Sequence, residues 1–114
     1  MQYALLIYEK PGAYDEFTDE DRRAVTAEYL ALRDDPRVVG GGRLQPVETS
    51  TTVRVQDGER LVTDGPFADT KEVFGGWYLL EADALDAALD LAAKIPAARL
   101  GGSVEVRPMV ELPV

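Results

Sequence analysis

The sequence predicts an α+β sandwich of the ferredoxin-like kind, an antiparallel sheet with two helices on one face. Two observations predict it. First, strand-like and helix-like segments follow the order strand, helix, strand, hairpin, strand, helix, strand. Second, the outer strands alternate apolar and polar residues, whereas the central ones are apolar on both faces. With 114 residues the chain fits a single domain, residues 1–114.

The N-terminal half supplies the first strand and the first helix. Residues 3–8 predict a central strand, because both of its faces are apolar: Tyr3, Leu5 and Ile7 on one, Ala4, Leu6 and Tyr8 on the other. A helix is predicted from Thr18, whose side chain can cap it, to the stop at Pro36. Its apolar stripe consists of Ala24, Val25, Tyr29, Ala31 and Leu32.

The middle of the chain predicts a glycine-rich strand and a hairpin. In residues 37–46, "RVVGGGRLQP", three glycines allow another backbone or a ligand to come close. A bulge or tight packing without a function is the alternative explanation. In residues 51–65, Asp57-Gly58 between β-branched runs indicates a hairpin turn.

The C-terminal half predicts strand, helix and strand. Residues 73–82 form the second central strand, with Val73, Trp77 and Leu79 on one face and Phe74, Tyr78 and Leu80 on the other. Asp83 is placed to cap a helix that Pro96 ends. In the last strand, residues 103–112, the inward positions are Val104, Val106 and Val110.

Composition excludes several kinds of site. The chain has no cysteine and no histidine, which removes disulfides, thiolate nucleophiles, the usual zinc ligands and the usual general base. We therefore expect no divalent metal and no cofactor. The net charge of -9 argues against a nucleic acid or an anionic membrane as partner. The first ten residues resemble neither a signal peptide nor a membrane span, so we expect a cytoplasmic protein.

A family resemblance rests on residues 64–72, "DGPFADTKE". This stretch resembles the signature of the YCII-related family, also called the DGPF domain. The resemblance continues through "YALLIYE", "GGGRLQP", "TTVRV", "GGWYLLEADALDAAL" and "IPAARLGGSVEVRP". It implies a dimeric α/β barrel built from ferredoxin-like protomers. The pattern independently predicts a homodimer, since a second copy is the simplest cover for the helix-free apolar face.

The resemblance implies less about activity. Some YCII-like proteins use a His-Asp pair, and one branch is linked to dehalogenating breakdown of aromatic compounds. The pair does not carry over, because this chain has no histidine. Other DGPF-bearing chains are labelled as transcription initiation proteins because of an association with sigma factors. This acidic sequence contains no DNA-reading element.

Asp64 is the candidate catalytic residue, and two roles remain open for it. Its carboxylate can accept hydrogen bonds from amides across the Gly65-Pro66 turn. Alternatively, the turn holds it at the mouth of a pocket as a general base or ligand acceptor. Phe67 is predicted to fill the core or the dimer seam. Lys71 and Glu72 are predicted to form a solvated pair.

The candidate ligand-binding residues are aromatic and basic. We expect a pocket for a flat or aromatic ligand, with its charge supplied by arginines: Tyr3, Trp77, Tyr78, Arg43 and Arg54. The alternative is that these aromatics fill the core and these arginines face solvent. The favoured function is a small-molecule binding domain or cofactor-free enzyme acting on a small aromatic or acidic metabolite, with Asp64 as polar anchor between helix-free sheet faces. The second hypothesis is a non-catalytic dimeric regulatory module, associated with sigma-factor systems.

Overall fold

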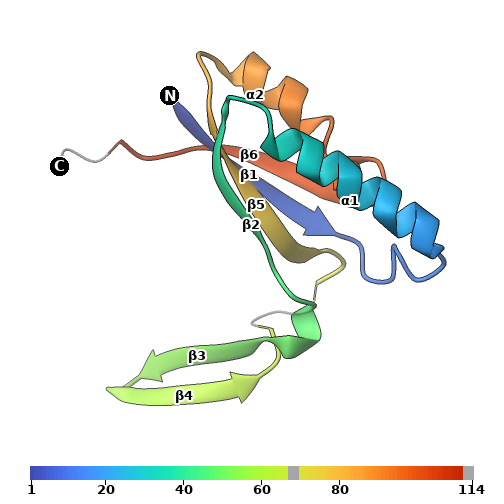
Figure 1. Ribbon diagram of the computed structural model, residues 1–114. Helices are drawn as coiled ribbons and strands as arrows, with labels where there is room; N and C mark the ends of the chain where they lie inside the picture. The colour runs from blue at the N-terminus through green and yellow to red at the C-terminus, as the bar shows by residue number, and fades with distance from the viewer. Residues whose placement is uncertain (67–69, 112–114) are drawn as a thin grey trace.

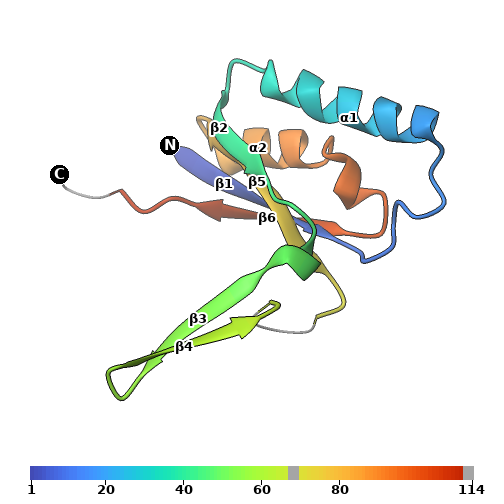
Figure 2. The same cartoon turned by 60° about the horizontal axis from the view of Figure 1, so that its bottom comes forward.

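The computed structural model describes residues 1–66 and 70–111. Its centre is a four-stranded antiparallel sheet in the order β2-β5-β1-β6, formed by Val38–Arg43, Val73–Glu81, Gln2–Glu9 and Ser103–Pro108. Helices α1 (Asp19–Arg33) and α2 (Leu85–Ala92) both lie on one face of this sheet (Figures 1 and 2). The sheet order and the one-sided helices confirm the predicted α+β, ferredoxin-like class.

The core lies between β1, β5 and the segment that contains α2. Fully buried side chains come from both strands, from α2, from the residue before the turn η2 (Pro96–Ala98) and from η2 itself: Leu5, Leu80, Leu91, Ile95 and Pro96. Leu5 and Tyr78 are cross-strand partners, so the helix-facing sides of β1 and β5 meet at the centre of the core. Helix α1 takes less part, because none of its residues is buried.

The two helices begin differently. Thr18 Oγ1 accepts a hydrogen bond from the Asp21 amide at 3.1 Å, and the Asp21 carboxylate accepts one from the Thr18 amide at 3.0 Å. The predicted cap of α1 is therefore confirmed. The predicted cap of α2 is wrong: Ala84 occupies the N-cap and no side chain caps the helix. Because α2 begins at Leu85, Asp83 lies one residue too early for the capping position.

Three predicted side-chain orientations are also wrong. Phe74 is predicted on the face of Tyr78 and Val73 on the face of Trp77, but a bulge between Ile7 and Tyr8 shifts the register. Phe74 pairs with Tyr8 on the helix-free face, and Val73 pairs with Glu9 on the helix-facing side. The two rings meet edge to face, with centroids 5.6 Å apart. Val110 was predicted to point inward. It is 79% exposed, because β6 ends at Pro108.

A hairpin of β3 (Thr51–Gln56) and β4 (Glu59–Asp64) forms a separate two-stranded sheet that projects from the sandwich (Figures 1 and 2). A short turn, η1 (Val47–Thr49), leads into it. The predicted Asp57-Gly58 turn is confirmed, with φ of 51° and 79° at these two residues. We call residues 51–64 the arm. Its apolar side chains Val53, Val55 and Val62 are exposed.

In the part of the chain that the structure describes, no helix combines the length and the apolar character that crossing a bilayer requires.

Candidate functional site

A cavity of about 490 Å³ lies between α1 and the strands β2 and β5. Five glycines border it: Gly40, Gly41, Gly42, Gly75 and Gly76. Gly41 pairs with Tyr78 and Gly76 pairs with Ile7, so both glycines occupy helix-facing positions of the sheet. Because these positions carry no side chain, the sheet leaves space below α1.

The glycine at position 41 cannot readily be replaced. Its φ is +155°, and a Cβ built on it would lie 2.6 Å from the carbonyl oxygen of Trp77. A side chain here would collide with the backbone of β5 as well as fill the cavity. The predicted close approach of another backbone to this glycine-rich strand is therefore present, and the cavity lies beside it.

Helix α1 forms the roof of the cavity. Its partly buried residues Tyr29 and Leu32 pack against the edge of the core. The Tyr78 hydroxyl on β5 donates a hydrogen bond to the Tyr29 carbonyl oxygen at 2.9 Å. This bond joins roof and floor, and burial raises the pKa of Tyr78, so the hydroxyl keeps its proton and remains a donor.

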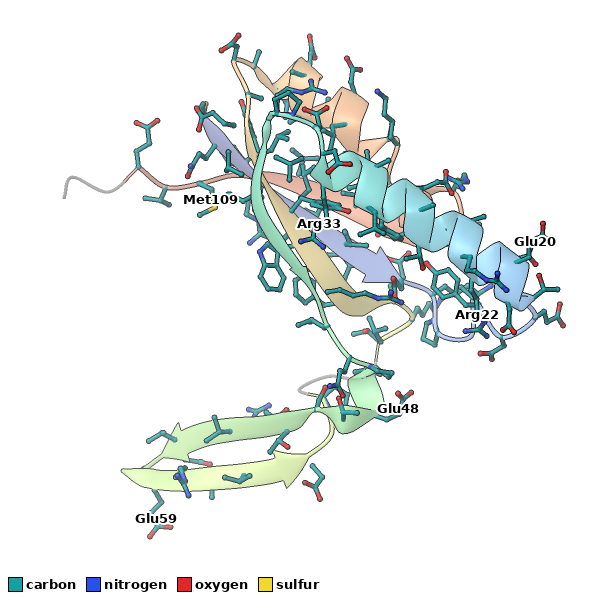
Figure 3. All side chains as sticks on the ribbon, in the orientation of Figure 1. Glu20, Arg22, Arg33, Glu48, Glu59 and Met109 are labelled. Carbon is teal, nitrogen blue, oxygen red and sulfur yellow. The ribbon has the colours of Figure 1, made fainter. Side chains whose placement is uncertain are left out.

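Two arginines border the cavity from opposite sides. Arg33 is the last residue of α1, and Arg43 is the last residue of β2. Figure 3 shows Arg33 extending from α1 toward the strands. Within residues 1–66 and 70–111, neither guanidinium forms an ion pair with an acidic side chain. The cavity therefore offers positive charge in a chain whose net charge is -9.

A smaller cavity of about 130 Å³ adjoins the larger one, and Glu9, Thr26, Tyr29 and Arg43 line both. We call it the annex. Glu9 ends β1, and a Cβ built on Gly75 would lie 2.9 Å from its carboxylate, so the missing side chain of Gly75 makes room for Glu9. The annex therefore combines an acidic group with a basic one.

Tyr14 reaches the annex from the loop between β1 and α1. Two contacts fix that loop: Arg22 Nη2 donates to the Tyr14 carbonyl oxygen at 2.8 Å, and the Tyr14 and Phe17 rings meet edge to face at 5.3 Å. Figure 3 shows Arg22 at the N-terminal part of α1, beside this loop. Burial, with the nearby Glu9 carboxylate next in importance, raises the pKa of Tyr14.

The Tyr29 hydroxyl oxygen is buried and has no hydrogen-bond partner among the described residues. Burial, reinforced by Tyr14, raises the pKa of Tyr29 far above its usual range. A buried hydroxyl without a hydrogen-bond partner costs about 1–3 kcal/mol, so a hydrogen bond to a ligand or to water would stabilise this group.

The described residues are less suited to metal binding, because among them no group of three or more acidic side chains is arranged to hold an ion.

The structure brings together some of the predicted site residues and separates others. Arg43 and Tyr78 line the cavity. Trp77 borders it too, but its ring packs over Gly42 on the helix-free face, where its cross-strand partner is Leu6. Tyr3 is 4% exposed in the core, and its hydroxyl approaches Met1 Sδ at 3.5 Å.

The remaining predicted residues lie on or beside the arm. Arg54 belongs to β3, and Asp64 is the exposed last residue of β4; neither lines the cavity or the annex. The turn after Asp64 is held by the Gly65 amide, which donates to the Ser50 carbonyl oxygen at 2.7 Å, and by Thr52 Oγ1, which donates to the Gly65 carbonyl oxygen at 2.8 Å. Phe67 lies outside the described residues.

Sequence reasoning missed Glu9, Tyr14, Tyr29 and Arg33 as site residues. Tyr29 was assigned only to the apolar stripe of α1, and the others had no assigned role. The glycines at 40–42, together with the predicted residues Arg43 and Tyr78, are the sequence signals that point to this place. The hypothesis of a pocket between helix-free faces concerned the opposite side of the sheet from the cavity described here.

Comparison with known proteins adds a family to this geometry. The sequence profile of the YCII-related domain matches residues 1–113. The chain belongs to the YCII-related family. An uncharacterized protein of Rhizobium meliloti (strain 1021) is 36% identical over 116 residues, covering 96% of this chain and 92% of the relative.

A solved structure similar to this YCII-related chain is 5-chloro-2-hydroxyhydroquinone dehydrochlorinase from Burkholderia phenoliruptrix AC1100, in complex with 2,5-dihydroxybenzoquinone. The TM-score is 0.53 with 17% identity, over 96% of this chain and 94% of the other. At this identity the likeness concerns the fold. It supports the ferredoxin-like assignment made from the strand order.

Proposed function

We propose that the protein binds a small aromatic or acidic molecule in the cavity between α1 and the strands β2 and β5. The observation that carries this proposal is the pair Arg33 and Arg43, two guanidinium groups at one cavity without an acidic partner among the described residues. The volume of the cavity, about 490 Å³, lies within the usual range for small-molecule sites. The anion would bind to the arginines, and the ring would lie over the glycines.

The dehydrochlorinase with the similar fold gives independent support for the class of ligand. That enzyme was solved with a flat molecule, 2,5-dihydroxybenzoquinone, bound to it. A hydroxyl-bearing ring of this size suits a cavity bordered by glycines and lined by tyrosines. Glu9, Tyr14 and Tyr29 also supply groups that exchange protons, so the proposal includes a cofactor-free enzyme as well as a binding domain.

The binding proposal is tested with benzoate by isothermal titration calorimetry. We expect benzoate to bind the wild-type protein, and Arg43→Gln and Arg33→Gln each to weaken binding about tenfold or more, because each removes a charge-assisted contact. Arg23→Gln is the matched control, since Arg23 lies on α1 away from the cavity. Absence of binding to the wild-type protein, or equal weakening by all three variants, would contradict the proposal.

We further propose that the protein forms a homodimer through its helix-free face. The apolar side chains of this face come from both central strands: Ala4, Leu6, Tyr8, Phe74, Trp77 and Leu79. Phe74 and Trp77 are 39% and 37% exposed in the single chain, and each copy offers the same surface to the other. This face is also what favours the second candidate function, a dimeric interaction module. The cytoplasm stays our predicted location.

Asp64 stays a proposed polar anchor, now as a residue that acts from the arm. Its exposed position outside the cavity means that it would reach a ligand only in an assembly or after movement of the arm. Asp64→Asn keeps an acceptor but removes the charge. We expect this variant to keep the stability of the wild-type protein and to weaken benzoate binding if Asp64 acts on a ligand. Unchanged binding would show that Asp64 has only a structural role in the turn.

A further inference from the structure

The annex presents hydrogen-bonding groups of both kinds to one small space. Tyr14, Tyr29 and Thr26 carry hydroxyls, and Arg22 and Arg43 carry guanidinium groups. Glu9 is the acidic residue among those that line it. An ionised carboxylate only accepts hydrogen bonds, whereas a tyrosine hydroxyl both donates and accepts. The annex therefore suits a ligand group that can donate and accept at the same place.

The strongest unmet requirement in the annex is that of Tyr29. Its hydroxyl oxygen is buried and forms no hydrogen bond within the described residues, although the Tyr14 hydroxyl and the Ala97 backbone lie near enough to influence its pKa. The hydrogen bond from Tyr78 to the carbonyl oxygen of the same residue, at 2.9 Å, holds the helix backbone at this point. A ligand acceptor that displaces the side chains covering the hydroxyl would satisfy it.

Glu9 has the complementary requirement. Its carboxylate lies over Gly75, in the space that an alanine side chain would occupy. Within the described part of the chain it forms no ion pair with Arg22 or Arg43. A donor brought by a ligand would bind a charged acceptor, which is the stronger kind of hydrogen bond.

We infer that the annex is a subsite for a phenolic hydroxyl, which donates a hydrogen bond to Glu9 and accepts one from Tyr29. This inference rests on the proposed binding of an aromatic anion in the larger cavity. The two cavities share Glu9, Tyr29 and Arg43, so one ring reaches both. The ligand class is therefore a hydroxy-substituted aromatic acid, with its acid group at the arginines and its hydroxyl in the annex.

The test compares benzoate with 3-hydroxybenzoate, 4-hydroxybenzoate and 4-methoxybenzoate by calorimetry. We expect the wild-type protein to bind at least one hydroxybenzoate about tenfold more tightly than benzoate, because one added hydrogen bond to a charged group raises affinity by about this factor. The methoxy compound accepts but does not donate, so it should lack this gain. Tyr29→Phe and Glu9→Met should each remove most of this gain, measured as the ratio of the hydroxybenzoate and benzoate affinities of the same variant.

Two further variants guard against indirect effects. Glu9→Gln keeps the length of the side chain and a neutral acceptor, and should lose part of the gain. Tyr8→Phe, on the helix-free face, removes a hydroxyl outside both cavities and should keep the whole gain. Circular dichroism and melting curves establish that each variant is folded.

The outcomes separate this inference from the proposed function. Benzoate binding with no preference for a hydroxyl, or a preference that Tyr29→Phe and Glu9→Met both leave intact, would overturn the inference alone. Failure of all four compounds to bind the wild-type protein would overturn the proposed function and this inference with it.

Discussion

The Tyr78 hydroxyl on β5 donates a hydrogen bond to the backbone carbonyl oxygen of Tyr29 on α1, at a distance of 2.9 Å. This hydrogen bond joins β5, on the strand side of the cavity, to α1, on the other side. No residue of α1 is fully buried. The bond therefore adds to the packing of the partly buried Tyr29 and Leu32 in holding α1 against the sheet.

Tyr78→Phe therefore tests the attachment of α1. Phenylalanine keeps the buried ring but leaves the Tyr29 carbonyl oxygen without its donor. We expect the free energy of unfolding to fall by about 0.5–1.5 kcal/mol, measured by urea denaturation. Tyr8→Phe removes a hydroxyl from the other face of the sheet and should cost less. Equal stabilities of the two variants would show that the bond does not hold the helix.

Gly41 tests the origin of the cavity. In Gly41→Ala the new Cβ would meet the Trp77 carbonyl oxygen at 2.6 Å, at a φ that favours glycine. We expect a loss of about 1–3 kcal/mol of unfolding free energy and a loss of benzoate binding. The matched control is Gly40→Ala, whose Cβ would find only an ordinary contact at 3.6 Å with Leu79. If both variants are equally stable, the close approach at Gly41 has been overestimated.

Asp35 predicts a pH dependence of stability. Side-chain and backbone hydrogen bonds from Arg37 lower the pKa of Asp35 from 3.8 to about 2. Since the folded-state pKa lies below the unfolded one, the stabilisation is present above about pH 4 and is lost as the pH falls toward 2. The difference in stability between wild type and Asp35→Asn should shrink over this interval. Asp34→Asn is the neighbouring control; a difference that stays constant with pH would refute the assignment.

The proposed dimer predicts the behaviour of Leu79. Leu79→Glu places a charge on the helix-free face, beside Trp77 and Phe74. We expect the wild-type protein to sediment as a dimer at micromolar concentration and this variant as a monomer, with emission of the single tryptophan shifted to longer wavelength. Leu89→Glu, an exposed position of α2, should remain dimeric. A wild-type monomer under these conditions would remove the proposal.

Local signals in the sequence were sufficient for most of the fold. Thr18 with Asp21 marked the start of α1, and Asp57-Gly58 marked the hairpin turn, because caps and tight turns depend on a few neighbouring residues. The side on which Phe74 lies could not be predicted, since a bulge in the pairing of β1 with β5 decides it. A bulge depends on the register of two distant segments.

The site was predictable only in part, for a similar reason. Arg43 and Tyr78 were proposed from residue type and do line the cavity. Glu9, Tyr14 and Tyr29 come from a strand end, a loop and a helix, and only the tertiary fold brings them together. The turn after Asp64 is unusual in the sequence and suggests a site, yet the arm projects from the sandwich (Figure 1) and Asp64 lines neither cavity.

The central claim is that the cavity between α1 and the glycine-rich strands binds an aromatic anion. The most direct measurement is a crystal structure of the protein with 4-bromobenzoate, whose bromine locates the ring by anomalous scattering. We predict the ring between α1 and the strands β2 and β5, with the carboxylate within hydrogen-bonding distance of Arg43 or Arg33. A bromine position on the helix-free face or beside the arm, with the cavity left empty, would contradict the account.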